Sequence, residues 1–373
     1  MDTQVIPANS SAPQILEIGQ APRMHHAYPR TTEFFSTYVM DSENSRPPGA
    51  RLVSAKTMVS LARRLSDPGL DLVVVHASPH GSLEGLIRTV FRRSMLQGHV
   101  PLFRGFAQQL LRRGTIAPLA VLDLHDSPSV LACNLHLLRS ATVYFKRELP
   151  PDRWQLLMRS GKTPTRRYRQ LEHYHPALSR IRPLSLGLPA DLLALGAPAL
   201  PPAGKDIDVF FAGQIKWSST VRERGIEELM QLRTEGFRVD IPEGGLSSGE
   251  YLARCARAWL VWSPQGYGWD CFRSYEAAFS GSVPLISRQT VERHEPFTDG
   301  EHAVYYDVEP GQLALAVRRA LNDRGRLVTM AQAARSHMLK HHTPHALARH
   351  VVETTLAAAG QSGLAMQPNA TSS

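Results

Sequence analysis

Short apolar runs alternate along this chain with segments in which apolar residues recur every three or four positions. The apolar runs Leu70–His76, Leu119–Leu124 and Ala141–Phe145 are bounded by turn-forming residues, which predicts buried strands. Helical spacing predicts helices at Ala55–Leu65 and, with arginines on the polar side, at Leu83–Arg93. Strands that alternate with helices are typical of a parallel sheet with helices on both faces.

The alternation resumes after a Pro-rich stretch, residues 183–202, in which X-Pro steps disfavour helix. Strands are predicted at Ile207–Ala212, Phe237–Ile241, Trp259–Trp262 and Val283–Ile286, and helices at Thr220–Leu232, Gly249–Ala256, Cys271–Phe279, Gln312–Leu321, Arg326–Lys340 and Pro344–Leu356. Two doubly wound α/β domains are therefore expected. Their predicted limits are residues 49–188 and 206–358, with a linker at 189–205, a flexible arm at 1–48 and a disordered tail at 359–373.

The composition fits a globular protein. With 373 residues, 43% of them hydrophobic and 20% charged, the chain can bury two cores, which argues against a disordered protein. Cys133, Cys255 and Cys271 show no C-x-x-C spacing, which argues against a disulfide framework and a structural zinc site. Neither a secretion signal nor a membrane-spanning apolar run is found, so a cytoplasmic protein is expected.

The net charge indicates an anionic partner. Lys and Arg exceed Asp and Glu by 42 to 33, which gives +9. Nucleic acid is not the expected partner, because no helix-turn-helix, zinc-finger or aromatic RNA-binding pattern is present. The basic helix around Arg88–Arg93 leaves open a peripheral contact with the inner membrane surface, beside ordinary packing. The histidines near the C-terminus, His337, His341, His342, His345 and His350, indicate a solvated helix face, since no carboxylate stands beside them at metal-ligand spacing.

The stretch from Ser263 to Glu276 has the most specific chemistry, because a strand end, a glycine turn and a helix start follow one another. Gly266 and Gly268 let backbone N–H groups approach a phosphate, and Asp270 is predicted to cap the helix. Arg273 and Glu276 share a helix face, so a cation for phosphate and a carboxylate for ribose hydroxyls can converge. The alternative is a glycine turn beside a solvent-exposed Arg–Glu pair.

These residues resemble a known family. The run Gly266–Ile286, with Glu276-Ala277-Ala278 and Gly281, resembles the donor-binding core of GT-B glycosyltransferases of the "group 1" kind. Asp299–His302 and Phe211–Gly213 resemble two further stretches of that family. The resemblance implies the GT-B architecture, in which two Rossmann-like domains face each other across a cleft, with C-terminal helices. It also implies a nucleotide-sugar donor, UDP- or GDP-linked, as substrate, with no bound cofactor and no metal ion.

The resemblance also implies a phosphate site beside Gly213. Arg224 matches the position of the family's phosphate-contacting lysine, and Lys216 and Arg222 are further candidates for that contact. Thr220 and Glu223 have the spacing of a capping box, which would put both arginines in the first turn of a helix. The alternative is a solvated basic first turn.

Gly268 departs from the family pattern. Retaining members carry two glutamates eight residues apart; Glu276 matches the second, which grips the donor ribose, and Gly268 stands in place of the first. Retention of configuration is therefore not implied. An inverting enzyme needs a general base in the N-terminal domain. His125 and Asp126, at a strand end, are the preferred pair, ahead of His76 and His80, with a helix cap or local hydrogen bond as the alternative.

The sequence thus predicts a glycosyltransferase that moves a sugar from a nucleotide-sugar donor to an unidentified acceptor. A glycan, a lipid-linked glycan or a natural product are the acceptors considered, with polysaccharide biosynthesis as one setting. Two alternatives stay open. One is a nucleotide-sugar epimerase on the same scaffold, and the other is a non-catalytic protein that binds a nucleotide sugar or a protein partner.

Overall fold

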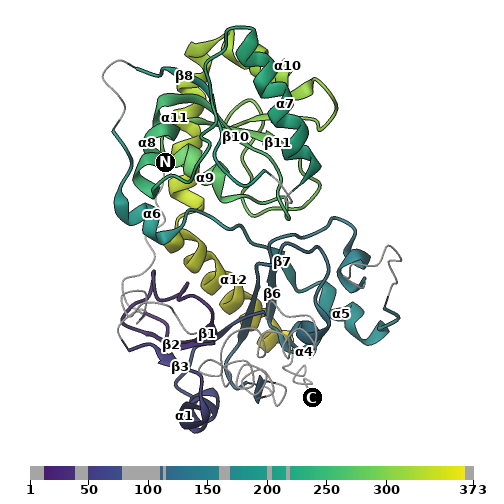
Figure 1. The fold of residues 1–373 in the computed structure, drawn as a ribbon. Helices are drawn as coiled ribbons and strands as arrows, with labels where there is room; N and C mark the ends of the chain where they lie inside the picture. Colours follow the sequence, from purple (N-terminus) through teal and green to yellow (C-terminus); the bar gives the residue numbers. More distant parts are fainter. Residues whose placement is uncertain are drawn as a thin grey trace, which may run out of the picture.

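The computed structural model describes residues 12–37, 49–77, 110–111, 115–158, 169–199, 204–215 and 219–365. Within these ranges the chain forms two parallel sheets, one from each half of the sequence, in two separate lobes (Figure 1). The predicted helix at 83–93 lies outside the described residues, as do Lys216 and His80.

The first sheet has seven strands in the order β3-β2-β1-β4-β5-β6-β7. These are β1 Ile15–Gly19, β2 Thr32–Ser36, β3 Arg51–Leu52, β4 Leu72–His76, β5 Leu119–Asp123, β6 Val143–Lys146 and β7 Ile181–Pro183. The helices of this half are α1 Ala55–Leu65, α4 Leu135–Ser140 and α5 His175–Leu178, with short 3₁₀ turns at Ala132–Asn134, Arg153–Leu157 and Glu172–Tyr174. All pairings are parallel, as expected for an α/β domain.

The prediction of a flexible arm over residues 1–48 is wrong for its described part. β1 lies near the middle of the first sheet, where Ile15 pairs with Thr32 of β2 and with Leu72 of β4. The strand was missed because its apolar run is interrupted by Glu17, which is fully buried. A charged residue inside a strand this short removes the apolar signal from which buried strands are predicted.

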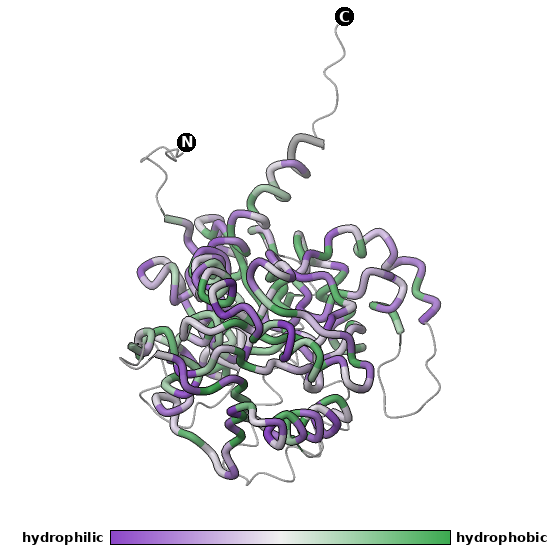
Figure 2. The backbone as a smooth tube through the Cα atoms, turned by 90° about the horizontal axis from the view of Figure 1, so that it is seen from above, coloured by the Kyte–Doolittle hydropathy of each residue, from purple (hydrophilic) through white to green (hydrophobic). Residues whose placement is uncertain are grey.

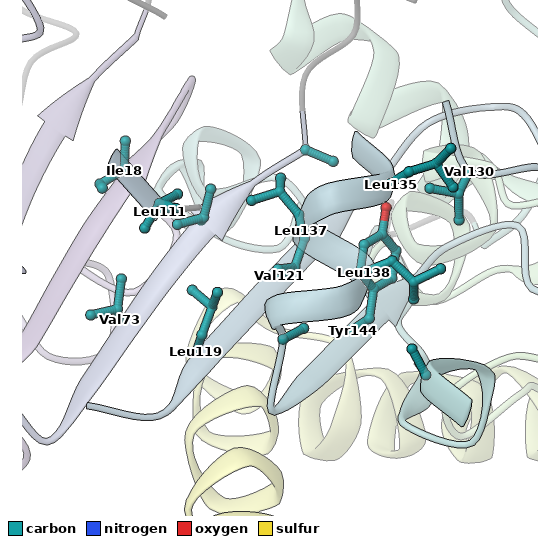
Figure 3. Close-up of a cluster of buried hydrophobic side chains, with 14 of the residues drawn as sticks. Ile18, Val73, Leu111, Leu119, Val121, Val130, Leu135, Leu137, Leu138 and Tyr144 are labelled. Carbon is teal, nitrogen blue, oxygen red and sulfur yellow. The ribbon is translucent and has the colours of Figure 1, made fainter. Parts of the chain in front are cut away.

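One face of the first sheet is covered by its own helices. Figure 3 shows Leu135, Leu137 and Leu138 of α4 packed over Val121 of β5 and Tyr144 of β6. This core explains why the predicted strands formed. Their apolar residues are buried on both faces, as in other parallel sheets enclosed by helices.

The second sheet has five strands in the order β12-β11-β10-β8-β9. Its strands are β8 Ile207–Phe210, β9 Val239–Asp240, β10 Ala258–Ser263, β11 Val283–Ser287 and β12 Val304–Tyr306, and its helices are α7 Thr220–Thr234, α8 Ser248–Arg257, α9 Phe272–Phe279, α10 Gln312–Leu321 and α11 Arg324–His341. β12 was not predicted, because it is only three residues long.

The last helix, α12 (Pro344–Ala365), leaves the second lobe and packs on the first sheet (Figure 1). Leu347, Ala348 and Val351 bury their side chains with Leu72 and Ala120 on the face that α4 leaves free. The predicted domain limit at residue 358 is therefore wrong, since this helix completes the core of the first domain. The predicted tail at 359–373 is wrong as far as residue 365, and Figure 2 shows the end of α12 projecting from the body of the molecule.

The linker also contains a helix, α6 (Ala190–Leu195), although its proline content argued against one. Pro189 stands at the N-cap of α6, where its missing N–H costs no helical hydrogen bond. Leu188 and Leu192 pack with Tyr275 and Phe279 of α9. The linker is thereby fixed against the second domain.

Candidate functional site

Two turns lie side by side at the carboxyl edge of the second sheet, because β8 and β10 are hydrogen-bonded neighbours. Gly213 follows β8 and Gly266 follows β10. A Cβ added at Gly213 would lie 2.5 Å from Nη2 of Arg273, and one added at Gly266 would lie 2.6 Å from Nη2 of Arg222. Only glycine therefore leaves room for these two guanidinium groups against the turns.

Arg222 reaches this edge from the first turn of α7. Ser219 is the N-cap of the helix, and its Oγ accepts the N–H of Arg222 at 3.3 Å. The prediction of a capping box that starts at Thr220 is therefore wrong, because the N-cap is Ser219. The Arg222 side chain is buried and donates from Nη1 to the carbonyl of Gln214 at 2.8 Å and from Nε to the carbonyl of Gln265 at 3.2 Å. Arg222 thus links the two turns.

Arg273 reaches the same edge from α9. Its Nε donates to the carbonyl of Ala212 at 3.0 Å, and its guanidinium lies 5.0 Å from the ring centre of Phe211. Burial, and next the charge of Arg273, lower the pKa of Arg222. Two guanidinium groups held this close repel one another, so an anion bound between the turns would be strongly favoured.

Glu276 lies one turn further along α9 and is partly exposed. Its Oε2 accepts the hydroxyl of Tyr251 on α8 at 2.7 Å. Burial raises the pKa of Glu276, while Tyr251 and Arg273 oppose that rise. Gly213, Gly266, Arg273 and Glu276, all predicted from the sequence, therefore lie at one edge of the sheet together with Arg222.

Asp270 does not cap α9, contrary to the prediction. The N-cap is Cys271, which makes no side-chain capping bond. The Asp270 carboxylate is buried and turned toward the segment that precedes the linker, where Oδ2 accepts the N–H of Leu186 at 2.7 Å. Oδ1 accepts the hydroxyl of Tyr275 at 2.9 Å and pairs with Arg293. Because its oxygens are used in this way, Asp270 holds that segment on the second domain.

Gly268 meets a carboxylate from the other domain. Glu148, which comes two residues after β6, accepts the N–H of Trp269 at 3.0 Å and the N–H of Asp270 at 3.1 Å. The preceding Arg147 donates to the carbonyl of Asp270 and pairs with Asp126. Burial raises the pKa of Glu148, although these hydrogen bonds oppose the rise. The glycine turn is thus held from both domains.

Two predicted cations are not placed at the site. Arg224 lies in the first half of α7 with an exposed side chain, and no hydrogen bond or ion pair of that side chain is found in the described part of the chain. Arg222, two residues earlier, points to the edge instead. Lys216 lies outside the described residues.

His125 and Asp126 do not form the expected pair. Asp126 is bound to Arg147, and the N–H of His125 donates to Oδ1 of Asp123 at 3.3 Å. The pair that does form is His76 with Glu17, whose Nε2 and Oε1 are 3.0 Å apart at the carboxyl edge of the first sheet. This pair could not be predicted from the local pattern, because 59 residues separate the two side chains.

Four of the five histidines near the C-terminus, His337, His341, His342 and His350, make ring contacts, so the prediction of a solvated helix face is wrong for them, whereas His345 is exposed as predicted. His342 is 1% exposed, and its Nε2 lies 2.7 Å from the carbonyl oxygen of Glu295. His350 of α12 stacks on His294, with ring centres 3.8 Å apart. No group of three or more His, Cys, Asp or Glu side chains suited to a metal ion occurs in the part of the chain that the structure describes. In the same part, no helix is long and apolar enough to cross a membrane.

Comparison with known proteins finds a family match for the part of this edge that β10 and α9 provide. Residues 253–353, which include β10, α9 and the glycine turn between them, match the model of a family described as glycosyl transferase-like. A search of curated protein sequences found no match to this chain.

Several solved structures share the whole fold. HepE from Anabaena, in complex with UDP and glucose, is 12% identical, with 91% of this chain and 99% of that one covered and a TM-score of 0.51. Sucrose-phosphate synthase from Thermosynechococcus elongatus is 13% identical, with 95% and 100% covered and a TM-score of 0.52. An α,α-trehalose 6-phosphate synthase from Burkholderia multivorans is 11% identical, with 94% and 100% covered and a TM-score of 0.54.

At these identities the structural likeness establishes the fold, and the family model covers the part of the second domain that carries Gly266, Arg273 and Glu276. The predicted two-domain α/β architecture and the resemblance to GT-B glycosyltransferases are confirmed. Residues 253–353 of the chain are therefore similar to a glycosyl transferase-like family, and the chain as a whole has the GT-B fold.

Proposed function

We propose that this protein transfers a glycosyl group from a nucleoside-diphosphate sugar to an acceptor hydroxyl. The observation that carries the proposal is the pair Arg222 and Arg273, two guanidinium groups held against the glycine turns at Gly266 and Gly213. A diphosphate is a ligand that such a pair of cations beside two glycine turns recognises. Structural relatives add support, since HepE was solved with UDP and with UDP-glucose, and a related trehalose-phosphate synthase is described as UDP-forming.

Each residue of the edge then has a defined role. Arg222 and Arg273 bind the diphosphate, which lies against the glycine turns at Gly213 and Gly266. Glu276, oriented by the hydroxyl of Tyr251, accepts hydrogen bonds from ribose hydroxyls. Lys216 and Arg224 stay as possible outer contacts of the phosphates, and Gly268 and Asp270 shape the turn.

At the anomeric carbon the reaction forms one bond and breaks one, and a proton is transferred besides. The acceptor oxygen bonds to the anomeric carbon, the bond from that carbon to the diphosphate oxygen breaks, and the hydroxyl proton passes to a base. The negative charge that develops on the leaving diphosphate is stabilised by the two guanidinium groups, which are preorganised by the Ala212, Gln214 and Gln265 carbonyls. We propose that this charge pair lets the reaction proceed without a metal ion.

For the proton, His76 is a better candidate than His125. Glu17 fixes the orientation of the His76 ring, whereas Asp126 is engaged by Arg147 and leaves His125 without a carboxylate partner in the described residues. A carboxylate that orients an imidazole is the usual arrangement of a general base.

The test has two stages. Calorimetric titration with UDP, GDP, ADP and CMP, each beside its sugar conjugate, should show tight binding of one nucleoside diphosphate. The matching nucleotide sugar is then incubated with candidate acceptors, and release of the nucleotide that depends on the acceptor would establish transfer. Isomerisation of the sugar without nucleotide release would instead show an epimerase, and binding without either reaction would show a non-catalytic protein. Absence of nucleotide binding would overturn the proposal.

A further inference from the structure

A cavity of about 180 Å³ lies where the two domains meet. Its walls come from the loop after β1, from β5, from the linker, from the first residue of α9 and from α12. Leu122, Leu186, Leu347 and Val351 make most of these walls apolar, and Phe272 closes the side that faces α9. The cavity therefore lies between the carboxyl edge of the first sheet and the helix that carries Arg273 and Glu276.

The lining of the cavity includes one cation, Arg23, and also His26, whose pKa is lowered by burial. Arg23 is held in place through its backbone, because its N–H donates to Oε1 of Glu17 at 2.8 Å. No hydrogen bond from the Arg23 guanidinium is found within the described residues. Burial lowers the pKa of Arg23, the nearby Glu17 raises it and Arg147 lowers it.

Glu17 is not free to serve Arg23 as a partner. Its carboxylate also accepts the N–H groups of Met24 at 3.1 Å and His25 at 3.4 Å, and it pairs with His76. The remaining polar wall residue from the linker, Ser185, donates its hydroxyl to the carbonyl of His294. Arg23 is therefore the charged group of this cavity that would gain most from an anion on a bound molecule.

We propose that this cavity is the acceptor site and that it takes an amphipathic acceptor, with an apolar part against the leucines and an anionic group, carboxylate or phosphate, on Arg23. The role of this cavity as an acceptor site rests on the proposed glycosyl transfer. The cavity as a binding site for such a molecule does not depend on that proposal. An oligosaccharide does not fit these walls, because each hydroxyl buried against leucine would lose its hydrogen bonds to water. An apolar cavity of similar size accepts a small aromatic ring, which sets the scale of the apolar part.

The test uses four probes without any nucleotide: 2-naphthyl phosphate, 2-naphthoate, 2-naphthol and inorganic phosphate. Calorimetric titration should show binding of the two naphthyl anions to the full chain, at least tenfold tighter than naphthol or inorganic phosphate. Comparison of the two anions tells whether phosphate or carboxylate is preferred. Equal binding of naphthol would overturn the role of Arg23, and equal binding of inorganic phosphate would overturn the role of the apolar walls.

Two variants with matched controls locate the site. Arg23→Gln removes the cation, and Ala190→Phe fills the cavity from α6. Each variant should lower the affinity for naphthyl phosphate at least tenfold. The controls are Arg30→Gln on the same loop and Ala194→Phe on the same helix, both at exposed positions. These two variants should leave the affinity for naphthyl phosphate unchanged. Binding that none of the variants alters, or no binding at all, would overturn the proposal.

The UDP titration separates this inference from the proposed function. Arg23→Gln and Ala190→Phe should bind UDP as the wild type does, which also shows that both variants are folded. Loss of UDP binding in these variants would contradict a separate acceptor cavity. If the wild type binds the naphthyl anions and no nucleotide, the cavity is a ligand site and the glycosyl-transfer proposal alone fails.

Discussion

The carboxylate of Glu148 occupies the space that a side chain at position 268 would need. A Cβ added to Gly268 would lie 2.5 Å from Oε1 of Glu148, although the two residues belong to different domains. Retaining relatives of the family that this sequence resembles carry a glutamate where this chain has Gly268. In this chain the Glu148 carboxylate reaches the same turn from the first domain. It accepts the N–H groups of Trp269 and Asp270.

Gly268→Ala should therefore destabilise the protein. The added methyl group collides with a carboxylate fixed by two backbone hydrogen bonds, and overpacking of this kind costs about 1–3 kcal/mol. Urea denaturation measures the loss. Gly245→Ala is the matched control, because a Cβ at Gly245 meets nothing within 4 Å. Equal stability of the two variants would show that Glu148 moves aside easily.

Arg222→Gln should weaken UDP binding more than Arg224→Gln does. Arg222 lies at the glycine turns, and Arg224 is exposed on the same helix. The comparison therefore tests whether the phosphate-binding arginine is Arg222, as the structure indicates, or Arg224, as the sequence pattern predicted. Charge-assisted hydrogen bonds contribute roughly 1.5–3 kcal/mol, which corresponds to about 10- to 150-fold in affinity. Calorimetric titration with UDP, UMP and uridine measures the loss of affinity, which should be largest for UDP. A greater loss in Arg224→Gln would reverse the assignment.

Glu276→Ala should weaken nucleotide binding about tenfold or more without unfolding the protein. The loss arises because the ribose hydroxyls would lose a charged acceptor. Tyr251→Phe removes only the bond that orients Glu276, so a smaller loss, about 0.5–1.5 kcal/mol, is expected. Glu243→Ala, exposed in a loop after β9, serves as the control. Unchanged UDP affinity in Glu276→Ala would remove this residue from the donor site.

The packed histidines should make the protein sensitive to acid. Burial, followed by the charges of His350, His341 and His337, lowers the pKa of His294 to about 3, and burial lowers the pKa of His342 and His350 as well. In the unfolded chain these rings titrate near pH 6.5, so between pH 6.5 and about 3 the unfolded state binds more protons than the folded state. The free energy of unfolding should therefore fall as the pH is lowered through this range.

Urea denaturation at pH 7.5, 6.5 and 5.5 measures that slope. Each buried histidine adds at most about 1.4 kcal/mol per pH unit, and solvent screening reduces this for His294. His350→Phe keeps a ring against His294 and removes one titrating group, so its slope should be shallower than that of the wild type. A pH-independent stability would contradict the prediction.

The sequence was sufficient for those parts of the fold in which local pattern and burial agree. β10, α9 and β11 lie within two residues of their predicted limits, because apolar runs and helical spacing there match the buried faces. β1 and α12 were misjudged for a different reason. The burial of Glu17 and the docking of Leu347 on the first sheet depend on partners that are distant in the chain.

The candidate site shows the same division. Gly213, Gly266, Arg273 and Glu276 were found because they are close to predicted strand ends. Arg222 and Arg224 were both candidates, but Arg224 was preferred, because the packing of α7 on the sheet, and not the local sequence pattern, decides which of the two faces the edge. Glu148 and the Glu17–His76 pair were missed because each acts across the fold.

The docking of α12 on the first sheet has a consequence for the order of folding during synthesis. Residues 204–341 supply every described strand of the second sheet and can complete their core as soon as they emerge from the ribosome. The first domain cannot do so, because Leu72 and Ala120 stay uncovered until residues 344–352 have been made. The domain that is translated first is therefore the one that folds last, and it exposes an apolar face through most of the time that the chain is being synthesised.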